Sequence, residues 1–181
     1  MIRVALWLLG GLLLGGIVHL GSVLLLPRTA TQDAYARLAP SAPVNTVVPL
    51  AAPTADDAAM PFMDPAFAAA VCRYDLAAGP MKFSVPVSQA YTSVSFYTRN
   101  GVAYYALNDR AAGKRVVELD LMTRQQREDQ PDDEDVTRAD RLVVESPTTT
   151  GLILVRALSP ERGQMRMARA ALAAAQCRVA Q

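Results

Sequence analysis

The chain has 181 residues, of which 51% are hydrophobic, and it carries 18 basic and 17 acidic residues for a net charge of +1. This length suits one small domain with an additional segment, and the apolar residues outside the N-terminal stretch are too few for a second membrane span. The balanced charge indicates neither nucleic acid nor any other strongly charged partner.

Residues 4–26 form an apolar stretch without a single charged side chain, bracketed by Arg3 and Arg28. A helix of this length spans about 34 Å, slightly more than the hydrocarbon core of a bilayer. A cleaved signal peptide is the alternative, but its apolar region is usually shorter and is followed closely by a cleavage site. We therefore expect an uncleaved single-pass anchor over residues 1–28. The short N-terminal tail favours a cytoplasmic N-terminus.

Small and polar residues share one stripe of this helix, namely Gly11, Gly15, His19 and Ser22. Small residues at a spacing of four allow a second helix to approach closely, so this stripe is a candidate packing surface. The alternative is that glycine is simply common in membrane helices. His19 is the only histidine of the chain, and we interpret it as a packing contact rather than as a proton-linked group.

Residues 29–61 are expected to be a proline-rich tether. Seven of the 12 prolines lie between Pro27 and Pro65, and proline favours extended or irregular backbone. Within this segment, residues 31–38 are compatible with two helical turns, and residues 44–48 with one edge strand.

Residues 62–181 are expected to form one domain of the α+β class, a mainly antiparallel β-sheet with a C-terminal helix packed on it. Asp64 and Pro65 favour the start of a short helix over residues 66–70. Alternating patterns predict strands at residues 71–76, 82–87, 115–121, 141–146 and 152–158, and a helical turn at 122–127. The acidic run 128–135 is expected to be a surface loop, and residues 159–176 a helix beginning at Ser159.

Residues 91–107 predict a β-hairpin around Asn100-Gly101. An Asn-Gly pair between alternating segments favours a two-residue type I′ turn, which pairs Val94 with Leu107 and Phe96 with Tyr105. We expect Val94 and Phe96 to face the core.

The sequence contains no recognised catalytic, cofactor-binding or metal-binding motif. If His19 lies in the membrane, the soluble domain has no histidine, which argues against histidine-based catalysis and the usual zinc sites. The two cysteines, Cys72 and Cys177, are candidates for a disulfide in an exported domain, and two buried free thiols are the alternative. We expect no cofactor, and the sequence favours a non-enzymatic role over an enzymatic one.

Asp109 is predicted to point toward the core at the end of the hairpin, where a carboxylate needs a charge partner or hydrogen bonds. Arg73, Asn108 and Arg110 are the neighbouring candidates. We interpret this group as a structural clasp, with a ligand or partner site as the alternative.

The stretches MDPAFAAAVCRYDLAAGPMKF and SVSFYTRNGVAYYALNDR, together with the anchor and the late cysteine, carry a family resemblance. The chain resembles the short, single-anchor form of bacterial membrane proteins with domain of unknown function 1254. The resemblance implies a Gram-negative inner-membrane protein with a periplasmic β-rich domain and a second small anchored partner. It implies no catalytic residues.

Two functional hypotheses remain. The first is a membrane-anchored binding or assembly module that acts with itself or with a similar anchored protein. The second is an envelope hydrolase using Asp75 or Asp109, or a small-ligand or lipid-binding protein using carboxylates near Asp109.

Overall fold

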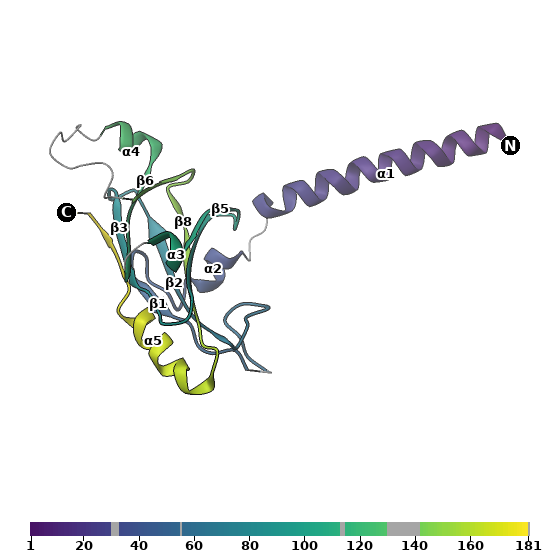
Figure 1. Ribbon diagram of the computed structural model, residues 1–181. Helices are drawn as coiled ribbons and strands as arrows, with labels where there is room; N and C mark the ends of the chain where they lie inside the picture. The colour runs from purple at the N-terminus through teal and green to yellow at the C-terminus, as the bar shows by residue number, and fades with distance from the viewer. Residues whose placement is uncertain (30–32, 55, 113–114, 130–141, 181) are drawn as a thin grey trace. The chain divides into compact units, whose positions relative to one another are not determined.

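The structure is a computed structural model that describes residues 1–29, 33–54, 56–112, 115–129 and 142–180. The chain divides into two compact units, Met1–Asp33 and Ala34–Gln181. The first unit contains the helix α1, and the second contains the strands and the other helices (Figure 1).

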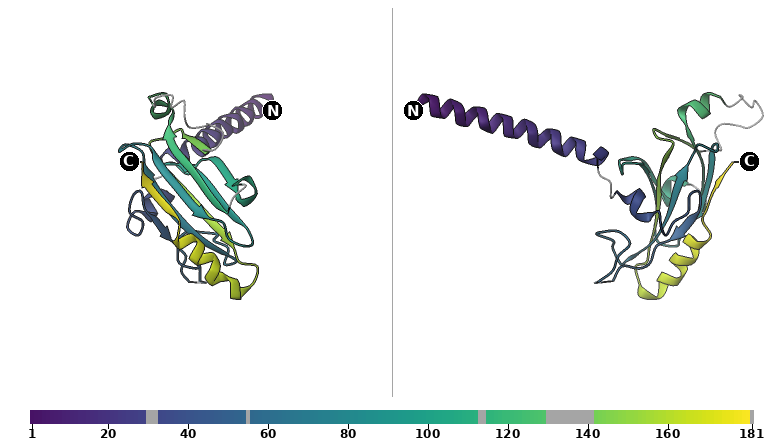
Figure 2. Two further views of the ribbon diagram at one scale, coloured as in Figure 1. Left: turned by 60° about the vertical axis from the view of Figure 1, so that its left-hand side comes forward. Right: turned by 180° about the vertical axis from the view of Figure 1, so that it is seen from behind.

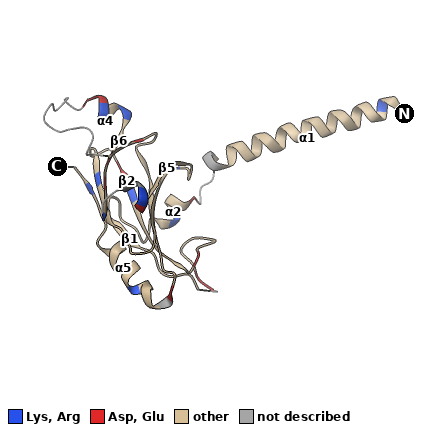
Figure 3. Cartoon of the chain, in the orientation of Figure 1, with Lys and Arg blue, Asp and Glu red and all other residues tan. Residues whose placement is uncertain are grey.

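Helix α1 extends over Ile2–Thr29. Its segment Ile2–Leu26 is 25 residues long with a mean hydropathy of 2.1, which is long and apolar enough to cross a membrane. In Figure 3 the cartoon of this helix is tan, the colour of uncharged residues, except for a basic residue near the N-terminus and the part that is not described. These properties are shared by membrane anchors and by signal sequences near an N-terminus.

The candidate packing stripe of α1 contains Gly11, Gly15, His19 and Ser22. A Cβ atom added at Gly11 or Gly15 would meet nothing within 4 Å. His19 is exposed, and the hydroxyl of Ser22 donates to the carbonyl oxygen of Val18 at 2.8 Å within the same helix. The hydroxyl of Ser22 is therefore satisfied without a second helix.

The second unit is built on two β-sheets (Figures 1 and 2). The five-stranded sheet is antiparallel throughout, in the order β1 (Val47–Pro49), β2 (Phe67–Asp75), β8 (Thr150–Leu158), β4 (Thr92–Thr98) and β5 (Ala103–Asn108). The four-stranded sheet has the order β7 (Leu142–Ser146), β6 (Val116–Thr123), β3 (Met81–Pro86) and β9 (Gln176–Val179).

The four-stranded sheet contains one parallel pair, β6 with β7, while its other pairs are antiparallel. The remaining elements of this unit are short: α2 (Ala34–Leu38), α3 (Asp109–Ala112), α4 (Arg124–Glu128), η1 (Arg162–Gln164) and α5 (Met165–Ala173). Helices α4 and α5 lie at opposite ends of the strands in each view (Figures 1 and 2). The α+β class predicted from the sequence is confirmed.

The main core lies between the two sheets, because each sheet turns alternate residues toward the other. The rings of Phe83 on β3 and Phe96 on β4 meet edge to face with their centroids 6.4 Å apart. Helix α5 adds the buried residues Ala168 and Leu172 to this core. The prediction that Phe96 faces the core is therefore confirmed.

The five-stranded sheet is also covered on part of its outer face. Val71 of β2 and Leu152 of β8 point away from the main core and pack with Tyr35, Leu38 and Ala42. Residues 34–50, which the sequence marks as part of a tether, therefore lie against this sheet. Burial on both faces explains why residues 152–155 of β8 are apolar without alternation.

The helix predicted at residues 66–70 is wrong, because these residues enter β2. The carboxylate of Asp64 accepts from the amide of Ala66 at 2.8 Å in a tight turn, instead of capping a helix. Strand β2 then pairs with β8 over nine consecutive positions, from Phe67 opposite Leu158 to Asp75 opposite Thr150. This continuous pairing outweighs the helical preference of its alanines.

The long C-terminal helix predicted at residues 159–176 is also wrong in its extent. Helix α5 ends at Ala173, and residues 176–179 form β9 along the edge of β3. The Ser159 hydroxyl donates to the carbonyl oxygen of Glu161 at 2.7 Å and does not cap α5, whose N-cap is Gln164. The backbone groups on this edge of β3 need hydrogen-bond partners, and β9 provides them.

The hairpin between β4 and β5 forms as predicted, but its turn differs. Val94 pairs with Leu107 and Phe96 with Tyr105, after which the register shifts so that Tyr97 faces Ala103. Gly101 has a φ of +78°, and its amide donates to the carbonyl oxygen of Thr98 at 3.0 Å. Asn100 lacks the positive φ that a type I′ turn requires, so the type I′ prediction is wrong and the loop contains a glycine bulge.

The other predicted elements are confirmed with small changes of boundary, namely the strands over residues 71–76, 82–87, 115–121 and 152–158, the turn at 122–127, and an edge strand within 44–48. The strand expected at 141–146 is described from Leu142 onward. Of the acidic run 128–135, all but Glu128 and Asp129 lies outside the described residues.

Gly151 provides a test of this sheet, because a Cβ atom at this position would overlap the carbonyl oxygen of Tyr97 and the hydroxyl of Tyr74. We expect Gly151→Ala to lower the free energy of unfolding by about 3 kcal/mol through overpacking. Urea unfolding followed by circular dichroism measures this change. The control is Gly163→Ala, where an added Cβ meets nothing within 4 Å, and equal stability of the two variants would contradict the prediction.

Candidate functional site

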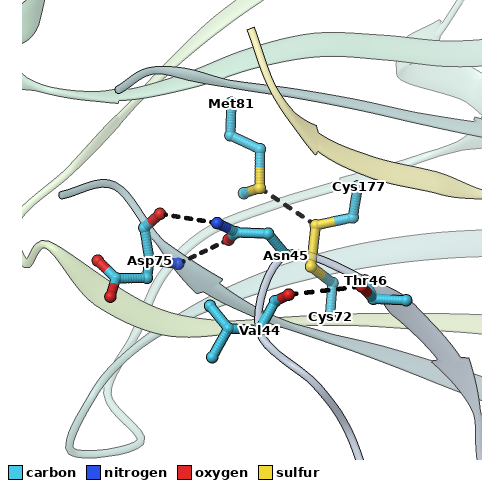
Figure 4. Close-up of a disulfide and its surroundings, with 7 residues drawn as sticks. All are labelled: Val44, Asn45, Thr46, Cys72, Asp75, Met81 and Cys177. Carbon is cyan, nitrogen blue, oxygen red and sulfur yellow. Dashed lines mark hydrogen bonds between the residues drawn. A yellow bond between two sulfur atoms is a disulfide. The ribbon is translucent and has the colours of Figure 1, made fainter. Parts of the chain in front are cut away.

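The two cysteines form a disulfide that joins the two sheets. Cys72 lies on β2 of the five-stranded sheet and Cys177 on β9 of the four-stranded sheet, 105 residues apart in the sequence. The Cys177 sulfur lies 3.2 Å from the thioether sulfur of Met81 in the buried core (Figure 4). Because Cys177 belongs to β9, the disulfide connects a strand of one sheet to a strand of the other.

Asn45 is a structural residue that the sequence reasoning missed. Its side-chain amide donates to the carbonyl oxygen of Asp75 at 3.1 Å and accepts from the amide of Asp75 at 2.8 Å (Figure 4). Asn45 has a φ of +56°, a conformation that asparagine tolerates better than most residues. The residue thus pairs with the end of β2 as another strand would.

The disulfide is expected to contribute strongly to stability, because it closes a long loop in the unfolded chain. We expect the double variant Cys72→Ala, Cys177→Ala to lose up to about 4 kcal/mol of unfolding free energy. Urea unfolding of the parent with and without reductant gives the matched comparison. Unchanged stability on reduction would contradict this expectation.

Arg73 holds α2 against the outer face of the five-stranded sheet. Its guanidinium lies 4.2 Å from the ring centroid of Tyr35, and Arg99 lies 4.4 Å from the same ring. The Nη1 atom of Arg73 also donates to the carbonyl oxygen of Ala42 at 3.0 Å. These cation–π and hydrogen-bonding contacts fix the helix that follows residue 33.

The other members of the predicted clasp lie where β5 ends at Asn108 and α3 begins at Asp109. Asp109 begins α3, and its Oδ1 atom is buried without a hydrogen-bond partner among the described residues. The side chain of Asn108 accepts from the amide of Arg110 at 3.1 Å. Asn108 pairs with Ser93 on β4, whereas Arg73 pairs with Leu152 on β8, so the structure does not bring Arg73 and Asp109 together.

Asp75, the second candidate carboxylate, is used to shape a turn. Its Oδ1 atom accepts from the amide of Ala77 at 2.9 Å, while its backbone is paired with Asn45. The described residues contain no group of three histidine, cysteine, aspartate or glutamate side chains that is placed to hold a metal ion. Asp75 and Asp109 therefore do not share a site.

A buried hydroxyl network lies at the hairpin end of the core. The Tyr74 hydroxyl lies 3.2 Å from the Tyr104 hydroxyl, 2.9 Å from the Ser146 hydroxyl and 3.2 Å from the carbonyl oxygen of Tyr97. Burial raises the pKa of Tyr104 well above its ordinary value of 10.0, and the neighbouring Tyr74 raises it further. The phenol is thus held neutral as a hydrogen-bonding group and is unsuited to act as a base at neutral pH.

The raised pKa of Tyr104 predicts a loss of stability in alkali. Above pH 10.0 the unfolded chain ionises this tyrosine while the folded chain does not, so the unfolding free energy falls as the pH rises further. We expect Tyr104→Phe to make this decline shallower when urea unfolding is compared between about pH 9 and about pH 11. Tyr105→Phe, on the same strand, is the control, and equal slopes for the parent and Tyr104→Phe would contradict the prediction.

An open apolar groove lies on the outer face of the five-stranded sheet and has a volume of about 390 Å³. We call it the outer groove. Its floor is formed by β2, β8 and Tyr97 of β4, and its walls by α2, Leu50 and residues 60–64. The floor residues from β2 and β8 are Phe67, Ala69, Val71, Leu152, Leu154 and Arg156.

The outer groove carries charge at one end of an otherwise apolar surface. Arg156 is exposed and its guanidinium lies 5.8 Å from the ring centroid of Phe67. Asp64, also at the groove, is engaged in its own turn through the amide of Ala66. A second hollow of about 170 Å³ beside α5 shares Leu50, Met63, Phe67 and Ala69 with the groove.

Such a surface can bind an apolar molecule or side chain, which is the ordinary chemistry of concave apolar sites. The outer groove was not among the sites predicted from the sequence. A signal was present, because residues 152–155 are apolar on both faces of the strand, which indicates that the sheet is covered on its outer side as well.

The comparisons with known proteins give a family, from a family model, and a similar fold, from a solved structure. Neither gives a function. A family model described as "Protein of unknown function (DUF1254)" matches residues 44–180. The VPA0106 protein from Vibrio parahaemolyticus has a similar fold, with a TM-score of 0.58 at 15% identity, over 81% of this chain and 34% of that chain.

An uncharacterized protein from Burkholderia cenocepacia gives a TM-score of 0.45 at 18% identity, over 75% of this chain and 41% of that chain. No curated protein matches the sequence. The chain therefore spans about a third of the length of the Vibrio protein, which it resembles in fold.

Proposed function

The chain belongs to the DUF1254 family of proteins of unknown function, and we propose that it is a membrane-anchored binding and assembly module. In this proposal α1 spans the inner membrane of a Gram-negative cell with its N-terminus in the cytoplasm, and the β-rich unit lies in the periplasm. The module acts with a second copy or with a similar single-anchor chain.

The observation that carries the proposal is α1 itself. Its 25-residue apolar segment has a mean hydropathy of 2.1 and contains one charged residue, Arg3, next to its N-terminal end. Burying such a helix in a bilayer is strongly favourable, whereas exposing it to water is costly.

The disulfide supports export of the second unit. Cys72 and Cys177 are joined in the core, and disulfides persist mainly in oxidising compartments such as the bacterial periplasm. The cytoplasm keeps thiols reduced, so a structural bond between these sheets favours the periplasmic side.

A partner chain is supported by the length comparison and by the surface of α1. The Vibrio protein of similar fold is much longer, since this chain covers 34% of it. In the proposal, a second anchored chain supplies a part that the longer protein carries in one polypeptide. The open stripe at Gly11 and Gly15 is the expected contact between the two membrane helices.

A hydrolase using Asp75 or Asp109 is the less favoured alternative. General acid–base catalysis requires two positioned groups in a cleft that admits the substrate. Neither carboxylate lines the outer groove or the smaller hollow beside α5, and the two belong to different ends of the sheet. Binding is therefore the better-supported activity of this unit.

The partner contact is tested by replacing the small residues of α1. We expect Gly11→Leu, Gly15→Leu to reduce crosslinking in native membranes, to itself or to another anchored chain, by at least about threefold, because the bulkier residues separate the helices. Gly10→Leu, Gly16→Leu is the matched control on other faces of the helix.

The same membranes test the anchor and its orientation. The chain should resist carbonate extraction, and protease added outside spheroplasts should digest the second unit. Release into the soluble fraction would contradict the anchor, and a strict monomer without any crosslink would contradict the partner.

A further inference from the structure

The outer groove has the shape of a site for a linear apolar chain. From Leu152 to Arg156 its floor follows five residues of β8, a length of about 13 Å. The floor side chain between these ends is Leu154, which pairs with Val71, and Ala69 pairs with Arg156 at the charged end. Its volume of about 390 Å³ lies in the range of small-molecule pockets.

Arg156 at the end of the groove has a second possible donor beside it, the hydroxyl of Ser93, which does not itself line the groove. Ser93 of β4 pairs with Arg156 of β8, so the two side chains are cross-strand neighbours on the outer face of the sheet. The Ser93 residue is 6% exposed, and its hydroxyl has no hydrogen-bond partner among the described residues. A buried hydroxyl is normally satisfied, so an acceptor at this place would complete it.

The rim of the groove carries an aromatic side chain that the folded chain does not use. Phe62 is fully exposed and has a φ of +59°, an unfavourable conformation for a bulky residue. Exposure of a phenylalanine beside an apolar hollow is explained if an apolar molecule lies under it.

We propose that the outer groove binds one unbranched fatty acid. The alkyl chain lies along β8 over Ala69 and Leu154, and the carboxylate accepts hydrogen bonds from Arg156 and Ser93. A guanidinium matches the geometry of a carboxylate, and this cation at one end of an apolar floor matches a single-chain anion. The other charged group at the groove, the Asp64 carboxylate, is engaged by the amide of Ala66 in its own turn. This inference does not depend on the anchoring or on the partner of the proposed function.

Photolabelling of the full-length chain in phosphatidylcholine nanodiscs tests the site. The probe is palmitic acid with a diazirine in its chain, and its methyl ester is the neutral control. We expect the acid to label residues 60–71 and 152–156, and the ester to label mainly α1. Arg156→Gln should reduce labelling of the groove about fivefold, which corresponds to about 1 kcal/mol of lost hydrogen bonding.

Matched variants separate the site from nonspecific effects. Arg178→Gln removes an exposed arginine from β9 of the other sheet and should leave labelling unchanged. Ala69→Leu fills the groove floor without adding a polar group and should abolish groove labelling, with thermal unfolding by circular dichroism showing that the fold is retained.

Three results would overturn the proposal. The first is labelling confined to α1, and the second is labelling of the groove by the ester as strongly as by the acid. The third is stronger labelling by a phosphatidylglycerol that carries the same diazirine in one chain, since this would assign the groove to a membrane phospholipid instead of a fatty acid.

Discussion

The pairing of β2 with β8 is the constraint on which the rest of the structure depends. These two strands are joined over nine consecutive positions near the middle of the five-stranded sheet. Because side chains alternate across a strand, every second residue is committed to the main core and the others to the outer face. Cys72 and Tyr74 thus enter the core, while Val71 and Arg73 support α2 and the outer groove.

The two faces of this sheet are closed in different ways. The inner face is sealed by the four-stranded sheet, by α5 and by the disulfide from Cys72 to Cys177, which together exclude water from the core. The outer face is covered only in part, by α2 and by the chain around residues 44–64, and the gap between these coverings is the outer groove. The contacts that stabilise the fold are therefore concentrated on the inner face of the sheet, and the open groove that can bind a ligand lies on the outer face.

The charged residues of this domain have roles that their position in the sequence does not reveal. Asp64 and Asp75 shape turns, and Arg73 stacks on Tyr35, so these residues serve structure. Arg156 is exposed, lies at the groove, and is paired in register with a serine whose hydroxyl is unsatisfied among the described residues. Arg156 at the apolar outer groove therefore supports a binding role better than any carboxylate of the domain does.

The sequence by itself determined the features that depend on local pattern. These are the apolar helix α1, the hairpin at Asn100-Gly101, most strands, and a cysteine pair suited to a disulfide. It assigned residues 66–70 to a helix, because alanine-rich segments favour helix until a long-range strand partner is present. It also extended the last helix to residue 176 and did not predict β9. The groove was decided only by tertiary structure, since Tyr97, Arg156 and residues 60–64 are distant in sequence and are brought together only by the fold.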